Sequence, residues 1–190
     1  QPQARRGFEP GARSVTWEAA DPNDDDLEYD VYYRAVDETV WKRIRTAIDE
    51  NFATLDSTAM PDGTYLFRIV ASDAPSNARG EALTTEALSP LFDVDNTPPR
   101  VEEIRAKPEA GGLRLTLTVR DTFSIIGETD YAVDAGDWTP IAPTDRINDA
   151  RVERYDVLIP APGRGEHSIV VRSSDAAGNV GAGKVIVHLP

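Results

Sequence analysis

Alternation of apolar and polar side chains constrains the fold of this chain more than any other feature. In residues 113–120, three leucines and a valine alternate with arginines and threonines. Successive side chains of a β-strand point to opposite faces, so this segment predicts a strand with one buried and one solvated face. Residues 29–33, 65–72 and 185–189 show the same alternation, and no long segment has a helical period.

Turn-forming residues separate the alternating segments. Clusters of Gly, Pro, Asn and Asp occur at residues 21–23, 61–63, 75–77, 162–163 and 178–179. Short strands separated by such turns are typical of β-sandwiches. The sequence therefore predicts an all-β fold.

A weak internal repeat divides the chain into two domains. The pattern Ser-Asp-Ala-x-x-Asn follows an alternating strand at residues 72–77 and again at residues 174–179. Between the copies, residues 95–99 read Asp-Asn-Thr-Pro-Pro, and the two prolines cannot donate to a strand ladder and stiffen the chain. A repeat at about 100 residues predicts duplicated domains. We place them at residues 1–96 and 97–190.

The charge balance narrows the classes of partner. The net charge is −13, with 9 Lys and Arg against 19 Asp and Glu in residues 1–96, and 11 against 14 in the remainder. Such a surface offers no basic stripe for nucleic acid, and no apolar run approaches the roughly 20 residues of a membrane helix. We expect neither nucleic-acid binding nor membrane insertion. Because the chain begins at Gln1 without a methionine, we expect a piece of a longer protein that is monomeric by itself.

No recognisable catalytic motif occurs in the sequence. The chain contains no cysteine, and its two histidines, His167 and His188, have neither metal-ligand spacing nor a neighbouring nucleophile. Glycine-rich phosphate-binding loops are missing as well. We predict that the chain is not an enzyme, with no catalytic residues and no cofactor other than a calcium ion.

The first half resembles a fibronectin type III domain. The residues that carry the likeness are 15–17 (Val-Thr-Trp), 29–34 and 60–69, the last of which contains Pro-Asp-Gly-Thr-Tyr. The likeness implies that Tyr65 forms a tyrosine corner. In that corner the phenol hydroxyl bonds to the backbone across a turn, while the ring packs in the core.

The second half resembles a bacterial immunoglobulin-like module, on residues 131–138, 165–172 and 175–179. The two resemblances together imply two seven-stranded antiparallel β-sandwiches in tandem, as found in secreted bacterial proteins. Three tryptophans are expected in the cores: Trp17 and Trp41 in the first, and Trp138 in the second.

Two groups of acidic residues present the oxygen atoms that Ca²⁺ prefers as ligands. The first group is Asp21, Asn23 and Asp25, in a loop of the first sandwich. It departs from the EF-hand pattern, because Asp26 replaces the glycine and Tyr32 replaces the final glutamate. The alternative for this loop is an ordinary solvated turn.

The second acidic group is expected at one end of the second sandwich. Its loops should bring Asp121, Asp149 and Asp175 near Asp93 and Asp95. The arrangement is loosely similar to the calcium sites of cadherin-type repeats. The alternative is that these side chains cap turns by accepting hydrogen bonds from nearby backbone N–H groups.

The function expected from these features is that of a non-catalytic structural or adhesive accessory module in a larger extracytoplasmic bacterial protein. It would act as a spacer and a protein-interaction surface, with other domains of the parent protein, another protein or a glycan as partners. The alternative is a carbohydrate-binding module that targets an attached enzyme or propeller domain. That role requires exposed planar aromatics, for which Tyr32 is the best candidate because it alternates with Val31 and Tyr33.

Overall fold

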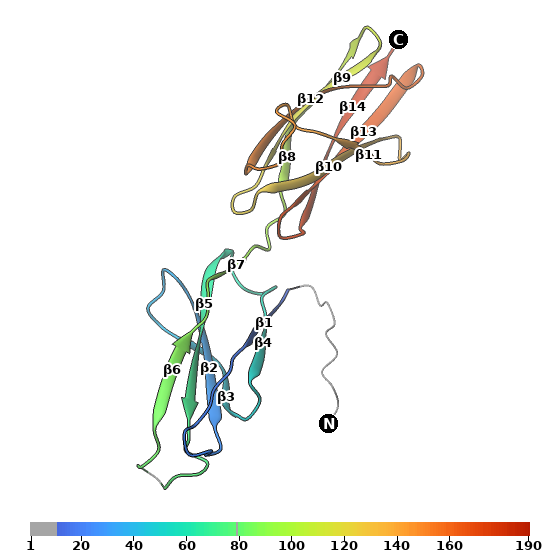
Figure 1. The fold of residues 1–190 in the computed structure, drawn as a ribbon. Coiled ribbons are helices and arrows are strands. Elements are labelled where there is room, and N and C mark those ends of the chain that lie inside the picture. The colour runs from blue at the N-terminus through green and yellow to red at the C-terminus, as the bar shows by residue number, and fades with distance from the viewer. Residues whose placement is uncertain (1–10, 79) are drawn as a thin grey trace. The chain divides into compact units, whose positions relative to one another are not determined.

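The computed structural model describes residues 11–78 and 80–190, and within them every regular element is a β-strand. The chain divides into two compact units, Gln1–Val94 and Asp95–Pro190 (Figure 1). The described residues contain no helix that is long and apolar enough to cross a membrane.

The boundary between the units lies two residues before the predicted one, so that Asp95 and Asn96 belong to the second unit. The reason is visible at Asp95. Its backbone carbonyl accepts a hydrogen bond of 3.0 Å from Asn179 Nδ2, and its buried side chain lies beside Asp121 and Asp175. These contacts attach the residue to strand ends of the second unit.

The first unit consists of two antiparallel sheets in its described part (Figure 1). The smaller sheet pairs β1 (Ala12–Thr16) with β4 (Phe52–Asp56). The larger sheet has the order β3 (Lys42–Ile48), β2 (Glu28–Ala35), β5 (Gly63–Ser72), β6 (Thr84–Leu88). β7 (Phe92–Val94) also pairs with β5, so β6 and β7 lie along the same edge of that strand.

The core of the first unit is formed by the alternating residues of β2 and β5. Tyr29, Val31, Phe67 and Ile69 are all at most 6% exposed and belong to one apolar cluster. Trp17 packs edge-on against Tyr29, with ring centroids 5.2 Å apart, as expected for a core tryptophan.

The tyrosine corner is present in the first unit. Tyr65 is 5% exposed, and its hydroxyl donates to the carbonyl oxygen of Pro61 at 2.8 Å. Its ring lies beside Tyr33 and stacks against Phe92. The hydrogen bond crosses the turn that leads into β5, so the corner fixes where this central strand begins.

The prediction that Trp41 packs in the core is wrong. The guanidinium groups of Arg34 and Arg68 each lie 4.8 Å from the centroid of its indole ring. Both arginines occupy positions that alternate with the buried residues Ala35 and Phe67, so they point to the outer face of the sheet. Trp41 therefore covers that outer face through cation–π contacts.

The second unit also has two antiparallel sheets, which contain three and four strands. One sheet has the order β12 (Val152–Ile159), β9 (Gly112–Arg120), β8 (Arg100–Glu109). The other has the order β11 (Thr139–Ile141), β10 (Ile126–Val133), β13 (Gly165–Asp175), β14 (Val180–Leu189). The described residues of each unit contain seven strands, and this all-β architecture confirms the fold class predicted from the sequence.

The core of the second unit contains the alternating face predicted for residues 113–120. Its three leucines and Val119 are buried, and they pack with Ile169 and Val171 of the opposite sheet. Three hydrogen-bonded side-chain hydroxyl groups lie in the same core. Thr129 Oγ1 is 2.9 Å from Tyr155 Oη and 2.7 Å from Ser173 Oγ, so these buried hydroxyls satisfy one another.

Trp138, which was predicted to lie in this core, is 42% exposed. It comes directly before β11, the edge strand of its sheet. The Arg172 guanidinium lies 4.2 Å from its ring centroid, on the outer face of β13, where Arg172 alternates with the buried Val171 and Ser173. As with Trp41, a cation–π contact holds the indole on a sheet surface.

Candidate cation-binding clusters

Two trios of aspartates bring carboxylate oxygens within 4.8 Å of one another in the described part of the chain. The first is Asp21, Asp25 and Asp73, and the second is Asp95, Asp121 and Asp175. Each trio lies within a single unit. Clusters of this kind could hold a hard cation, so the partners of each carboxylate decide what the cluster can do.

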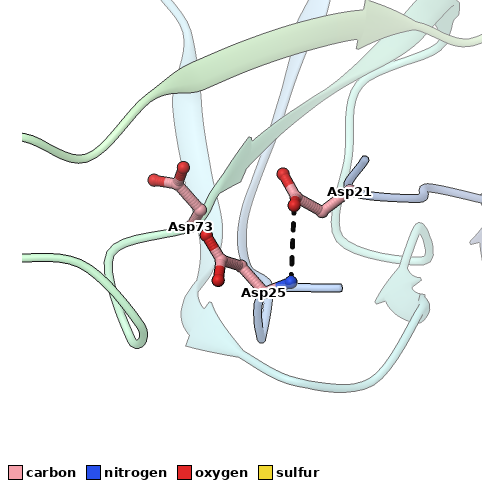
Figure 2. Close-up of side chains that lie close together, drawn as sticks. All are labelled: Asp21, Asp25 and Asp73. Carbon is pink, nitrogen blue, oxygen red and sulfur yellow. Dashed lines mark hydrogen bonds between the residues drawn. The ribbon is translucent and has the colours of Figure 1, made fainter. Parts of the chain in front are cut away.

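In the first trio, Asp21 and Asp25 lie in the loop between β1 and β2, and Asp73 follows β5 directly (Figure 2). Asp21 Oδ1 accepts the backbone N–H groups of Asn23 and Asp25, at 2.9 and 3.3 Å. This is the hydrogen bonding of a capped turn, the alternative that the sequence left open for this loop.

Two side-chain amides already donate to one carboxylate of the first trio. Asp25 Oδ2 accepts hydrogen bonds from Asn23 Nδ2 at 2.8 Å and Asn77 Nδ2 at 3.0 Å. Asp73 Oδ1 accepts the backbone N–H of Leu83 at 2.7 Å. Asn23, predicted as a cation ligand, instead donates to its neighbour through its amide nitrogen. The carboxylates therefore have donors that stabilise their charge without an ion.

Asp73 was not predicted as a member of this group. The internal repeat could have identified it, because Asp73 occupies the same place in Ser-Asp-Ala-x-x-Asn as Asp175, which was predicted. In both units the Asn of the repeat contacts the Asp: Asn77 Nδ2 donates to the backbone oxygen of Asp73, and Asn179 Nδ2 donates to Asp175 Oδ2.

The second trio is buried. Asp95 is 7% exposed, and Asp121 and Asp175 are each 5% exposed. Asp121 follows the end of β9, Asp175 is the last residue of β13, and Asp95 precedes β8. The ends of strands from both sheets of the sandwich thus bring the three carboxylates together, as the sequence predicted for Asp95, Asp121 and Asp175.

One oxygen of each carboxylate in this trio is held by backbone N–H groups. Asp121 Oδ1 accepts from Phe123 and Ser124, both at 2.7 Å. Asp95 Oδ1 accepts from Thr97 at 3.1 Å, and Asp175 Oδ1 accepts from Asn179 at 2.9 Å. The second oxygens of Asp95 and Asp121 are buried and have no hydrogen-bond partner.

The electrostatic environment of Asp95 opposes its negative charge. Burial raises the pKa of this carboxyl above its usual range, hydrogen bonds from the Ser124 side chain and the Thr97 backbone lower it, and the neighbouring charges of Asp121 and Asp175 raise it further. None of the ion pairs between described residues includes a member of the trio. The cluster can therefore lower its charge by taking up a proton or a cation.

Two other predicted members lie elsewhere. Asp93 belongs to β7 of the first unit, is exposed, and accepts a hydrogen bond of 2.7 Å from Thr64 Oγ1. Asp149 lies in the loop before β12 of the second unit, and its backbone N–H donates to Oε1 of Glu153 in that strand. The prediction that Asp93 and Asp149 join the cluster is therefore not supported by this geometry.

The remaining candidate side chains have structural partners. His167 lies between Asp134 Oδ2 at 2.6 Å and the Gly163 carbonyl oxygen at 2.9 Å. The ring of Tyr32, considered for glycan binding, lies 4.7 Å from the Arg68 guanidinium, and its hydroxyl donates to Asp30 Oδ2 at 2.9 Å. One face of the Tyr32 ring, the best candidate for stacking on a sugar, is thus covered by the Arg68 side chain of the same sheet.

The described residues form two antiparallel β-sandwiches that follow one another along the chain. Among solved structures, the chain is similar to the fibronectin(III)-like modules of Clostridium thermocellum CbhA, at 15% identity and a TM-score of 0.39, covering 95% of this chain and 86% of that one. It is also similar to the FN1–FN3 domains of chicken CNTN1, at 13% identity and a TM-score of 0.37, covering 96% of this chain and 63% of that one. No protein-family model and no curated protein matches the chain.

Proposed function

We propose that the chain is a non-catalytic structural or adhesive accessory module of a larger extracytoplasmic protein, where it acts as a spacer and a protein-interaction surface. The observation that carries the proposal is the division of the chain into two self-contained sandwiches, each with its own buried core. The extracytoplasmic location follows from the resemblance of the sequence to modules of secreted bacterial proteins.

The shifted pKa of Asp30 supports a structural role for this side chain. Hydrogen bonds from Thr46, the Ala47 backbone and Tyr32 lower the pKa of Asp30 against the opposing effect of burial. Asp30 thereby ties β2 to the neighbouring strand β3. In an enzyme, we would expect such perturbed groups to converge on a cleft that binds substrate. Here the shift arises from contacts that hold two adjacent strands together.

An exposed sheet edge supports the interaction surface. All five residues of β6 are exposed, and β6 is the last strand of its sheet. Three leucines on or beside this strand are also exposed: Leu88 at 56%, Leu91 at 62% and Leu83 at 74%. Apolar side chains along a free edge fit a partner that adds an extended segment to the sheet.

A replacement experiment in the parent protein separates the two parts of the proposal. If residues 11–190 act only as a spacer, an unrelated pair of β-sandwiches of equal length will preserve the function of the parent. If they also bind a partner, the replacement will abolish binding, and Leu88→Lys will weaken it while Val36→Lys, at another exposed site, will not. Turnover of a substrate by the isolated chain, abolished by a single substitution, would contradict the proposal.

A further inference from the structure

We propose that Asp95, Asp121 and Asp175 bind one Ca²⁺ ion inside the second unit. This inference goes beyond the proposed function and does not depend on it. It rests on two separate observations. Three carboxylates lie together with at most 7% exposure, and two of their oxygens are buried with no hydrogen-bond partner.

The unpartnered oxygens are the observation that points to a ligand. Buried polar atoms in folded proteins nearly always have a partner, and an ion is one of the partners that can serve. Oδ2 of Asp95 and Oδ2 of Asp121 are without one, although both carboxylates are held firmly through Oδ1. The backbone therefore fixes these side chains and leaves one oxygen of each available.

The third carboxylate is oriented by Asn179. Its backbone N–H and its amide Nδ2 donate to the two oxygens of Asp175, both at 2.9 Å. The same Nδ2 donates to the backbone carbonyl of Asp95 at 3.0 Å. Asn179 thus sets the position of Asp175 relative to Asp95, as a residue behind the ligands does in a metal site. A carboxylate that accepts two hydrogen bonds retains lone pairs for an ion.

The donor atoms favour calcium over other ions. The trio supplies only carboxylate oxygens, a set that suits hard cations rather than zinc or copper. Calcium accepts irregular arrangements of six to eight oxygens, whereas magnesium demands near-ideal octahedral geometry. A trio drawn from three separate chain segments, completed by water or backbone oxygens, is more compatible with calcium.

The less buried trio of the first unit provides a control within the same chain. Asp21, Asp25 and Asp73 lie within the same 4.8 Å of one another as the second trio, and one oxygen of each accepts a hydrogen bond from an amide or backbone donor. None of these three residues has a buried oxygen without a partner among the described residues. We therefore expect binding at the second trio, where two buried oxygens have no partner, and not at the first.

Isothermal titration of the chelator-treated whole chain with CaCl₂ tests the assignment. We expect one ion per chain and no comparable heat with MgCl₂. Asp121→Asn should weaken binding by at least about 100-fold, because even residues behind the ligands can cost up to about that much. Asp25→Asn, the matched control, should leave the affinity unchanged.

Thermal unfolding provides a second measurement, in which the order of the unfolding temperatures of Asp121→Asn and the unmodified chain should differ between chelator and calcium. In chelator, Asp121→Asn should unfold at the same or a higher temperature than the unmodified chain, because Oδ1 still accepts its two backbone hydrogen bonds and a buried charge is removed. At a calcium concentration near 100 times the Kd, the unmodified chain should gain roughly 10 °C and the variant should gain nothing.

Three results would overturn the assignment. The first is the lack of both heat and a shift in unfolding temperature at millimolar CaCl₂. The second is binding that Asp25→Asn abolishes and Asp121→Asn preserves, which would place the ion in the first unit. The third is equal affinity for Mg²⁺ and Ca²⁺. If Asp121→Asn unfolds in chelator at a lower temperature than the unmodified chain, both experiments are repeated with Asp95→Asn. In that variant Oδ1 also keeps its backbone hydrogen bond.

Discussion

Individual side chains in this protein act mainly by fixing turns, and His167 shows how. Both nitrogens of its imidazole face acceptors, the Asp134 carboxylate and the Gly163 carbonyl, so only the doubly protonated ring can donate to both. The hydrogen bond with Asp134 is the main cause that raises the pKa of His167, while burial opposes it. The same contact lowers the pKa of Asp134.

The pH dependence of this pair follows from the two directions. Because the folded pKa of His167 is raised, its contribution to stability is complete below the unfolded value of about 6.5 and is lost as pH rises through the folded pKa. Asp134, with a lowered pKa, contributes above its unfolded value of about 3.9. We predict that His167→Gln lowers the unfolding temperature more at about pH 6 than at about pH 9. A difference that does not change with pH would contradict this.

Tyr65 allows a second test at the scale of one hydrogen bond. Tyr65→Phe keeps the buried ring and removes the bond to the Pro61 carbonyl. We predict a loss of about 1 kcal/mol in the free energy of unfolding of the first unit, measured from the urea midpoint. The control is Tyr33→Phe, which removes a hydroxyl from the neighbouring ring, 6.4 Å away between ring centroids. Equal effects of the two substitutions would show that the corner bond adds nothing.

At the scale of elements, β8 and β14 approach so closely that one position excludes a side chain. A Cβ added at Gly181 would lie 1.7 Å from the Pro99 carbonyl oxygen and 2.8 Å from its carbonyl carbon. Pro99 is fully buried, so its backbone cannot move without disturbing the start of β8. The spacing between these strands therefore depends on a glycine at this position.

We predict that Gly181→Ala destabilises the second unit by about 1–3 kcal/mol, as overpacking usually does. Gly163→Ala is the matched control in the same unit, because an added Cβ there meets no atom within 4 Å. That substitution should be neutral or stabilise by up to about 1 kcal/mol through the unfolded chain. Chemical denaturation of both variants measures the difference, and a Gly181→Ala variant as stable as Gly163→Ala would refute the close approach.

The sequence predicts strands of this fold best where one face is buried and the other is solvated. β5 and β9 were found by alternation because their apolar residues fill the cores. β6 has no such signal, since all five of its residues are exposed. Trp41 and Trp138 were misplaced because their arginine partners lie on neighbouring strands, and a sequence does not show which polar face an indole will cover.

The buried trio could be predicted because the ends of sandwich strands gather at a common pole, where Asp121 and Asp175 stand at strand ends and Asp95 lies in the segment that leads into β8. Asp93 was included because it lies two residues from Asp95, but it belongs to β7, where its side chain accepts a hydrogen bond from Thr64. The partners of the carboxylates could not be predicted. Which oxygens accept backbone hydrogen bonds and which stay unpartnered depends on loop geometry that the alternation pattern does not contain.

For the whole molecule, the two units differ in how much core they contain. The second unit has one continuous cluster of eleven buried apolar residues, whereas the described part of the first has two clusters, of six and four. Burial of apolar surface is the main driving force of folding, at roughly 25 cal/mol per Å². The first unit also carries more of the negative charge, and self-repulsion lowers stability further. We therefore expect the first unit to be the less stable of the two.

The central claim is that the chain is a pair of self-sufficient structural modules. Differential scanning calorimetry of the separate segments Gln1–Val94 and Asp95–Pro190 tests it most directly. We predict that each segment unfolds in one cooperative transition, with equal calorimetric and van't Hoff enthalpies, and that Asp95–Pro190 unfolds at the higher temperature. A segment that shows no transition by itself, but folds when the other is joined to it, would contradict the claim.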